Sequence, residues 1–224
     1  MGNKIFFLVI GLCLIFSTSA RAEHREIQES GQKVDGIVLY RSNYINPEES
    51  KGFWSHDINT YLLIDKQYGI GLDATFCPEN DYLKANPFAT WKVVDGLSVL
   101  GGLSLNSLGA DYVQAGVWYF GTLGEKIKIF LDPRVYLETN DKAKSFVETF
   151  VEASYPLNDK LTLAVNILHD HWLGNGADWL LIGPVVYWKI NPSITVFTRI
   201  ARETNFEIEG KNGTDLRLGL KWSF

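Results

Sequence analysis

The last nine residues of the chain, 216–224, alternate strictly between apolar and polar or small side chains. Apolar residues occupy every second position, and the positions between them hold Arg217, Gly219, Lys221 and Ser223. Because successive side chains of a β-strand point to opposite faces, this segment has one wholly apolar face and one polar face. The chain therefore ends in a predicted strand whose two faces meet different solvents.

Similar alternation recurs between residues 32 and 224, where no helical spacing of apolar residues is sustained. Tight turn signals such as Asp95-Gly96 and Asn191-Pro192-Ser193 alternate with longer polar connections. These boundaries predict twelve strands, at 33–42, 54–64, 68–77, 87–94, 97–105, 111–121, 126–138, 145–156, 161–171, 178–189, 194–203 and 214–224.

An even number of strands of about 9–11 residues fits an all-β fold, an antiparallel transmembrane β-barrel with tight turns at one end and loops at the other. Pro133 and Pro184 fall inside predicted strands, where each removes a ladder hydrogen bond, and we expect bulges there. If those strands are broken instead, the count falls to ten, which remains the alternative.

Composition alone hides this pattern. The chain is 46% hydrophobic and 21% charged, with a mean hydropathy of -0.03, which fits an ordinary globular protein and excludes collagen-like, disulfide-framework and disordered classes. Composition carries no information on period, however, and a value near zero also arises when an apolar face and a charged face are averaged.

The N-terminus has the features of a signal peptide at residues 1–22: a basic Lys4, an apolar run, and the small-x-small pattern Ala20-Arg21-Ala22. The remaining residues, 23–224, form the predicted barrel. Removing Lys4 and Arg21 changes the formal charge from -5 to -7, which argues against nucleic acid as a partner. Cys77 is the one cysteine left, so no disulfide can form within this part of the chain.

The signal peptide, the strand spacing and a last strand ending in Trp222-Ser223-Phe224 resemble bacterial outer-membrane β-barrel proteins of the small porin-like class. The resemblance implies a location among the lipids of the bacterial outer membrane, with both termini periplasmic. It also implies that Trp222 and Phe224 belong to the signal read by the barrel assembly machinery. A soluble periplasmic lipocalin-like or sandwich protein is the alternative class.

Aromatic residues cluster near the ends of the predicted strands, as expected for two interfacial girdles. We assign the residues near the periplasmic ends to one girdle and those near the extracellular ends to the other, and Trp91 alone among the tryptophans falls clearly in mid-strand. The assigned tryptophans are Trp118, Trp188 and Trp222 on the periplasmic side and Trp54, Trp172 and Trp179 on the extracellular side.

Strand parity places almost every mid-strand charge on one face, which we assign to the lumen. These charges are the candidate selectivity surface of a narrow channel or uptake porin for small polar solutes. The same charges would fill the lumen of a closed structural or adhesive barrel, which remains an alternative. The candidates are Asp73, Lys128, Asp132, Arg134, Glu138, Glu148, Glu152, Arg199, Glu203, Asp215, Arg217 and Lys221.

One cluster, His169-Asp170-His171, raises a hydrolase acting on lipid or peptide at the outer rim as a further alternative. Omptin-type proteases pair Asp with His at this rim, but His56-Asp57 is the nearest match and lies on a nearly opposite strand. Ser145 lies close enough in the strand scheme to approach His171, without an acid partner or oxyanion donor. The sequence therefore favours a channel over an enzyme, and we assign no catalytic residue, cofactor or metal.

Overall fold

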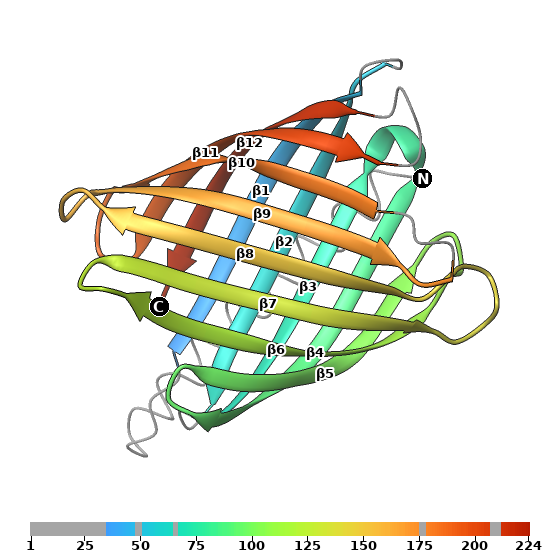
Figure 1. The fold of residues 1–224 in the computed structure, drawn as a ribbon, viewed down its shortest axis with the longest axis horizontal. Coiled ribbons are helices and arrows are strands. Elements are labelled where there is room, and N and C mark those ends of the chain that lie inside the picture. Colours follow the sequence, from blue (N-terminus) through green and yellow to red (C-terminus); the bar gives the residue numbers. More distant parts are fainter. Residues whose placement is uncertain (1–34, 48–50, 65–66, 175–177, 207–211) are drawn as a thin grey trace.

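The chain forms a closed antiparallel barrel of twelve strands in a computed structural model that describes residues 35–47, 51–64, 67–174, 178–206 and 212–224 (Figure 1). Each strand pairs with its neighbours in sequence, and β1 pairs with β12 to close the ring. The strands are β1 (Asp35–Pro47), β2 (Phe53–Ile64), β3 (Tyr68–Cys77), β4 (Tyr82–Val94), β5 (Leu97–Asn106), β6 (Tyr112–Leu123), β7 (Ile127–Glu138), β8 (Phe146–Pro156), β9 (Leu161–Trp172), β10 (Asp178–Lys189), β11 (Ile194–Asn205) and β12 (Gly213–Ser223).

The predicted count of twelve is confirmed, and the alternative of ten is wrong. The predicted signal peptide lies outside the described residues. A single turn of 3-10 helix, Pro78–Asn80, connects β3 to β4. Within the described ranges, no helix is long and apolar enough to cross a bilayer.

Two strands extend by five residues beyond the predicted bounds at one end: β1 continues to Pro47, and β4 begins at Tyr82. Both extensions contain polar residues, which led us to assign them to loops. In the structure Asn43, Lys84 and Asn86 face the interior cavity. A polar lumen thus makes hydrophilic composition an unreliable sign of a loop in this fold.

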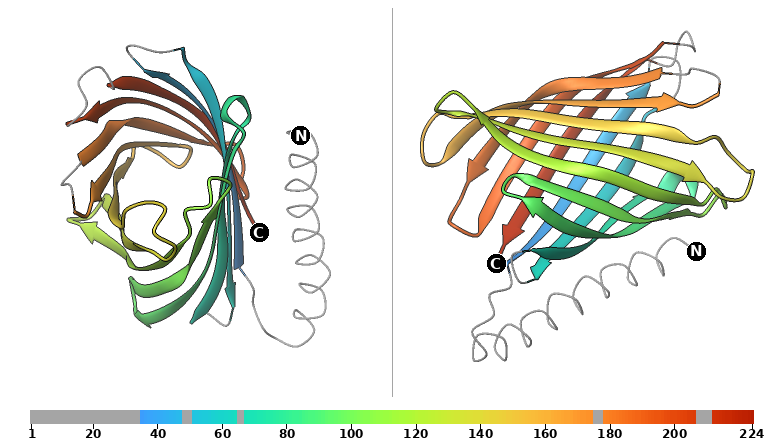
Figure 2. Two further views of the ribbon diagram at one scale, coloured as in Figure 1. Left: turned by 90° about the vertical axis from the view of Figure 1, so that its right-hand side faces the viewer. Right: turned by 60° about the horizontal axis from the view of Figure 1, so that its bottom comes forward.

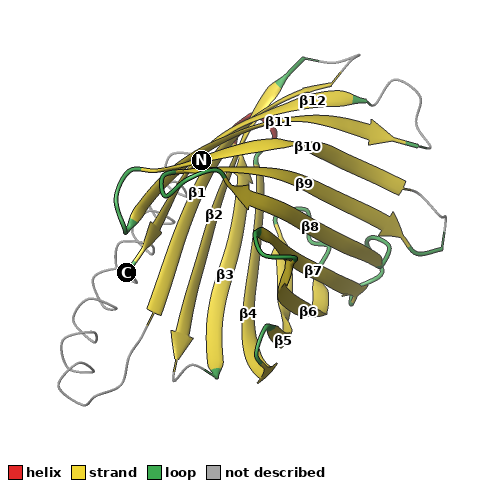
Figure 3. Cartoon of the chain, turned by 60° about the vertical axis from the view of Figure 1, so that its left-hand side comes forward, coloured by secondary structure: helices red, strands yellow, loops and turns green. Residues whose placement is uncertain are grey.

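The strands form nearly all of the described barrel wall (Figures 2 and 3). By the strand bounds, the connections at one end span two to four residues and those at the other end four to seven. Tight turns join β2–β3, β4–β5, β6–β7, β8–β9 and β10–β11, all at the end where the chain terminates. The remaining connections lie at the opposite end. The predicted alternation of tight turns and longer connections is therefore confirmed.

The C-terminal residue takes part in closing the barrel. The amide of Gly36 donates to the carbonyl of Phe224 at 2.9 Å, and the amide of Phe224 donates back to the carbonyl of Gly36 at 3.0 Å. The Phe224 ring packs against Trp222, with ring centroids 4.8 Å apart. These contacts extend the β1–β12 seam by one hydrogen-bonded pair beyond β12.

The expected bulges at Pro133 and Pro184 are wrong. The β6–β7 and β10–β11 pairings are interrupted over two residues beside each proline, yet each resumes in the same register. A glycine beside each interruption allows close approach: a Cβ on Gly116 would lie 2.5 Å from the Pro133 carbonyl oxygen. The one register shift of the barrel's described pairings lies between Lys92 and Val94, on β4.

Gly183 illustrates the same close approach and gives a testable prediction. A Cβ at this position would overlap the carbonyl oxygen of Ile200 and lie 2.5 Å from the Cα of Ala201. We expect Gly183→Ala to lower the free energy of unfolding, measured with urea in lipid vesicles, by about 1–3 kcal/mol. Gly101→Ala is the control, because its nearest atom, the Gln114 carbonyl oxygen, is 3.8 Å away. Equal losses in both variants would contradict a specific role for Gly183.

The outer face is apolar. On β12, Leu216, Leu218 and Leu220 are exposed, while Arg217 and Lys221, at alternate positions, line the interior cavity. Soluble monomers rarely expose contiguous apolar area on the scale of the whole barrel, whereas a lipid-facing band requires it. The two-solvent strand predicted at the C-terminus is therefore observed.

The aromatic girdles differ from the prediction. Trp118 and Trp179 line the cavity, and Trp172 packs against an inner aromatic cluster, because parity turns these three rings inward. Trp91 is half exposed and pairs with Tyr68 near the tight-turn end, since β4 begins earlier than predicted. Position along a strand therefore did not identify the face of the barrel that a ring occupies.

Candidate channel lumen

The barrel encloses a cavity of about 1770 Å³. Its wall includes residues at both ends of the strands, from Asp35 and Lys221 at the tight-turn end to Pro47 and Asn205 at the loop end. All of its lining residues come from strands, apart from Gly96 in a tight turn. Within the described part of the chain, side chains of the wall therefore set the width of the lumen, without a loop folded into it.

Eleven of the twelve predicted lumen charges line this cavity; the exception is Glu138. Glu138 ends β7, and its carboxylate accepts hydrogen bonds from the backbone amides of Asn140, Asp141 and Lys142, at 2.6–3.1 Å. Its assignment to the lumen surface is therefore corrected: parity is right within the strand, but the terminal side chain turns back to hold the β7–β8 connection. The role of the other eleven in selectivity stays a prediction.

Parity reasoning also missed several lining charges, namely Asp35, Arg41, Asp57, Lys84 and Lys92. Arg41 lies on β1 and Asp57 lies on β2. From the sequence alone, Asp57 was considered only as part of the His56-Asp57 pair. Together with the eleven, the described wall carries eight basic and eight acidic side chains. The lumen is thus formally neutral, although the chain as a whole is acidic.

A cluster of three arginines shares two carboxylates on the β1, β2, β11 and β12 side of the lumen. Arg199 contacts Asp215 at 2.9 Å and is 1% exposed, so this pair is buried in the wall. Arg41 lies 3.3 Å from Asp57, and Arg217 lies 3.9 Å from Asp215. With three positive and two negative groups, this arginine cluster has one surplus positive charge.

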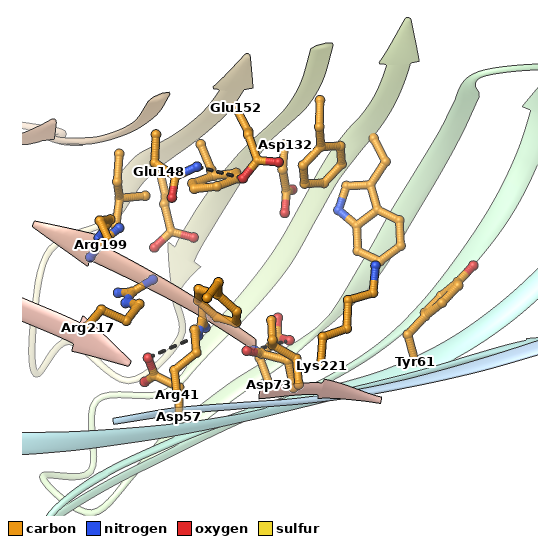
Figure 4. A pocket seen from close by; sticks show the side chains of 18 of the residues that line it. Arg41, Asp57, Tyr61, Asp73, Asp132, Glu148, Glu152, Arg199, Arg217 and Lys221 are labelled. Atoms are coloured by element: carbon orange, nitrogen blue, oxygen red, sulfur yellow. Dashed lines mark hydrogen bonds and ion pairs between the residues drawn. The ribbon is translucent and has the colours of Figure 1, made fainter. Parts of the chain in front are cut away.

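An acidic pair, Glu148 and Glu152 on β8, lies across the cavity from Arg41 and Asp57 (Figure 4). Glu152 accepts hydrogen bonds from Asn166 at 2.7 Å and from the Tyr187 hydroxyl. Glu148 accepts from the Tyr136 hydroxyl at 3.3 Å. Among the described residues, no lysine, arginine or histidine lies within ion-pair distance of either carboxylate, although Glu148 is the cross-strand neighbour of Arg134 on β7.

A third network crosses the interior from β7 to β3. Arg134 binds both carboxylate oxygens of Asp132, at 2.8 and 2.7 Å, and reaches Asp73 at 3.0 Å. Its guanidinium also lies over the rings of Phe88 and Trp118, at 5.2 and 5.9 Å. We call these three charged residues the Arg134 bridge.

The Arg134 bridge continues into a packed aromatic cluster. Tyr112, Tyr136 and Phe146 are buried there, with Trp172 packed against them. Gln114 and Ser104, on the neighbouring strands β6 and β5, are also fully buried. The loop-end part of the β4–β8 side is therefore filled with side chains, which confines the open lumen there to the side of β8 through β12, β1 and β2.

The histidine cluster lies apart from this lumen. His169 and His171 both contact the carboxylate of Asp178, each at 2.9 Å, and neither lines the cavity. The Ser145 hydroxyl instead accepts a hydrogen bond from the backbone amide of Glu138, at 3.0 Å. Among the described residues, no group of three or more His, Cys, Asp and Glu is placed to hold a metal ion. The two histidines therefore share one aspartate, and no hydrogen bond joins Ser145 to His171 among the described residues.

Comparison with known proteins supports the fold. No family model and no curated protein matches the sequence. Solved structures do match. One is the KdgM porin, which has a TM-score of 0.63 and 11% sequence identity; the match covers 84% of this chain and 99% of the porin chain. The NanC porin follows, with a TM-score of 0.62, 10% identity, and 83% and 98% covered.

A third match is the COG4313 outer membrane channel from Pseudomonas putida F1, with a TM-score of 0.57, 14% identity, and 86% and 96% covered. At these identities the likeness concerns the fold alone. The predicted small porin-like barrel class is confirmed at that level, and any function must be argued from the lumen.

Proposed function

We propose that this protein is an outer-membrane channel through which small polar solutes diffuse. The observation that carries the proposal is a continuous cavity whose wall reaches both ends of the strands and holds eight basic and eight acidic side chains among the described residues. Charged rings around a water-accessible path are the usual basis of selectivity in pores. A closed structural barrel would instead need its interior filled, whereas here packed clusters on the β6–β9 side and on the β9–β11 side leave a cavity of about 1770 Å³ between them.

The location and orientation belong to the same proposal. The signal peptide supports export, and the apolar outer face supports contact with outer-membrane lipids. The chain ends on the tight-turn side, which is the periplasmic side in single-chain bacterial barrels. Trp222 and Phe224 would then present the terminal strand to the barrel assembly machinery from the periplasm.

The similar structures do not supply the solute. One of them is the KdgM porin in complex with disordered oligogalacturonate, an acidic sugar polymer. In this protein the lining charges sum to zero, and the acidic pair has no cationic partner within ion-pair distance among the described residues. An anionic solute would meet repulsion at Glu148 and Glu152, so the lumen does not favour that substrate class.

Single-channel recording tests the proposal. Purified, folded protein added to a planar lipid bilayer is expected to give stepwise ion currents, and a sample boiled in detergent serves as the control. Folding is checked by gel migration before and after boiling, since a closed barrel resists detergent until it is heated. If folded protein gives no stepwise currents even at high protein concentration, that result would contradict the proposed channel function and favour a closed barrel.

A further inference from the structure

Two groups of lining charges of opposite sign, the arginine cluster and the acidic pair, face each other across the lumen (Figure 4). On one side, the arginine cluster pairs Arg41, Arg199 and Arg217 with only two carboxylates. On the other side, Glu148 and Glu152 are held by neutral donors alone, namely two tyrosine hydroxyls and an asparagine amide. Glu203 and Lys221 line the same side as the arginine cluster and cancel each other formally. Because the cluster has one cation more than its two paired carboxylates, and the acidic pair has no ion-pair partner among the described residues, the local field between the two groups runs across the lumen.

The charged side chains of the two groups that face each other are accessible from the cavity. Arg41 keeps 23% of its side chain exposed and Arg217 keeps 12%, whereas Arg199 is buried. All four of Arg41, Arg217, Glu148 and Glu152 line the cavity, and in Figure 4 the acidic pair and Arg41 lie on opposite sides of it. The fixed hydrogen bonds of the glutamates hold their carboxylates toward the wall, so the field does not depend on mobile side chains.

We propose that the preferred solutes of this channel are small zwitterions that carry a carboxylate and an ammonium group. This inference rests on the proposed channel function. A zwitterion turned across the lumen places its carboxylate toward Arg41 and Arg217 and its ammonium toward Glu148 and Glu152. An anion is attracted by the two arginines but repelled by the acidic pair. A cation is attracted by the acidic pair but repelled by the arginines, and a neutral sugar forms no charged contact with either group.

Liposome swelling distinguishes these solute classes. Vesicles containing the native protein are placed in isotonic L-glutamine, a zwitterion, or in L-arabinose, a neutral pentose of similar mass. Exposed charge pairs contribute weakly, so we expect glutamine to enter faster by roughly two- to ten-fold. The double variant Glu148→Gln, Glu152→Gln removes both charges of the acidic pair and keeps their hydrogen-bonding capacity. We expect it to bring the ratio of the glutamine rate to the arabinose rate near one.

The control is Glu125→Gln, which makes the same chemical change at an exposed position in the β6–β7 turn, outside the cavity. It should leave the ratio unchanged. If the double variant does not fold, each single glutamine variant is measured, and each is expected to lower the ratio part of the way.

The outcomes separate the two proposals. Ion currents together with equal rates for glutamine and arabinose would overturn the zwitterion preference and leave the channel standing. A ratio that survives in the folded glutamine variants would also overturn the preference. Absence of both currents and swelling would overturn the channel itself.

Discussion

Replacing Arg134 with alanine is expected to lower the free energy of unfolding of the barrel by about 3–5 kcal/mol, because the change leaves buried carboxylates without their partner. Arg134 is 6% exposed and binds Asp132 through two parallel hydrogen bonds while it reaches Asp73 across the interior. Urea unfolding in lipid vesicles measures the loss. Lys128→Ala is the control, because Lys128 lines the lumen without an ion pair among the described residues.

Removing the whole Arg134 bridge should separate its structural role from its effect on the pore. The triple variant Asp73→Asn, Asp132→Asn, Arg134→Met removes all three charges with little change in volume, and replacement of a buried ionic network by matched neutral groups is often close to neutral in stability. We therefore expect most of the lost stability to return. A triple variant as unstable as Arg134→Ala would show that packing, and not unpaired charge, is what Arg134 contributes.

Shortening the bridge then tests whether it narrows the lumen. In Asp73→Asn, Asp132→Asn, Arg134→Ala, no side chain spans from β7 to β3 at this point, and the single-channel conductance should rise about two-fold as the path widens. The methionine variant is the matched control, since its side chain still fills the gap. Equal conductance in both would mean that the ions never pass this side of the barrel.

The sequence predicted the barrel well because its decisive signals are local. Alternation along each strand and the order of tight turns and longer connections follow directly from residue types, and together they determined the number of strands. The same parity placed eleven charges in the lumen. The prediction for Glu138 was wrong because a side chain at a strand end can bend toward the backbone amides of the next connection. Strand parity does not describe such a bend.

Contacts across the lumen were not predictable in this way. Asp73 and Arg134 are 61 residues apart, on strands that do not pair, and their meeting depends on barrel width and side-chain length. Arg41 was missed for a different reason: it lies in the predicted strand 33–42, but the apolar run from Ile37 to Tyr40 before it does not alternate, so parity assigned it no face. The three-dimensional closure of β1 on β12 brings it beside Arg217.

The structure also identifies which basic residue best reports ion selectivity. Sequence parity alone makes charge reversal at Arg199 and Arg217 an attractive test, but Arg199 is buried against Asp215, and its reversal would place two carboxylates together in the wall. Lys221 lines the cavity two residues from the end of β12 and forms no ion pair with a described residue. A change at Lys221 therefore alters the charge of the lumen without breaking a buried pair.

Lys221→Glu is expected to shift the channel toward cations, raising the ratio of potassium to chloride permeability by roughly two- to five-fold, since a lumen charge changes by two units at short range. Zero-current potentials across a bilayer with a KCl gradient measure this ratio. The shift should be larger at 0.1 M than at 1 M salt, on the order of the change in Debye length from about 10 to about 3 Å.

Lys160→Glu provides the matched control, because it makes the same charge change at an exposed turn on the same end of the barrel, outside the cavity. Its shift should be small and should vanish at high salt, where charges at the mouth are screened. Equal shifts in the two variants would show that selectivity arises from the potential around the mouth, and the charged walls of the lumen would then have no part in choosing which ions pass.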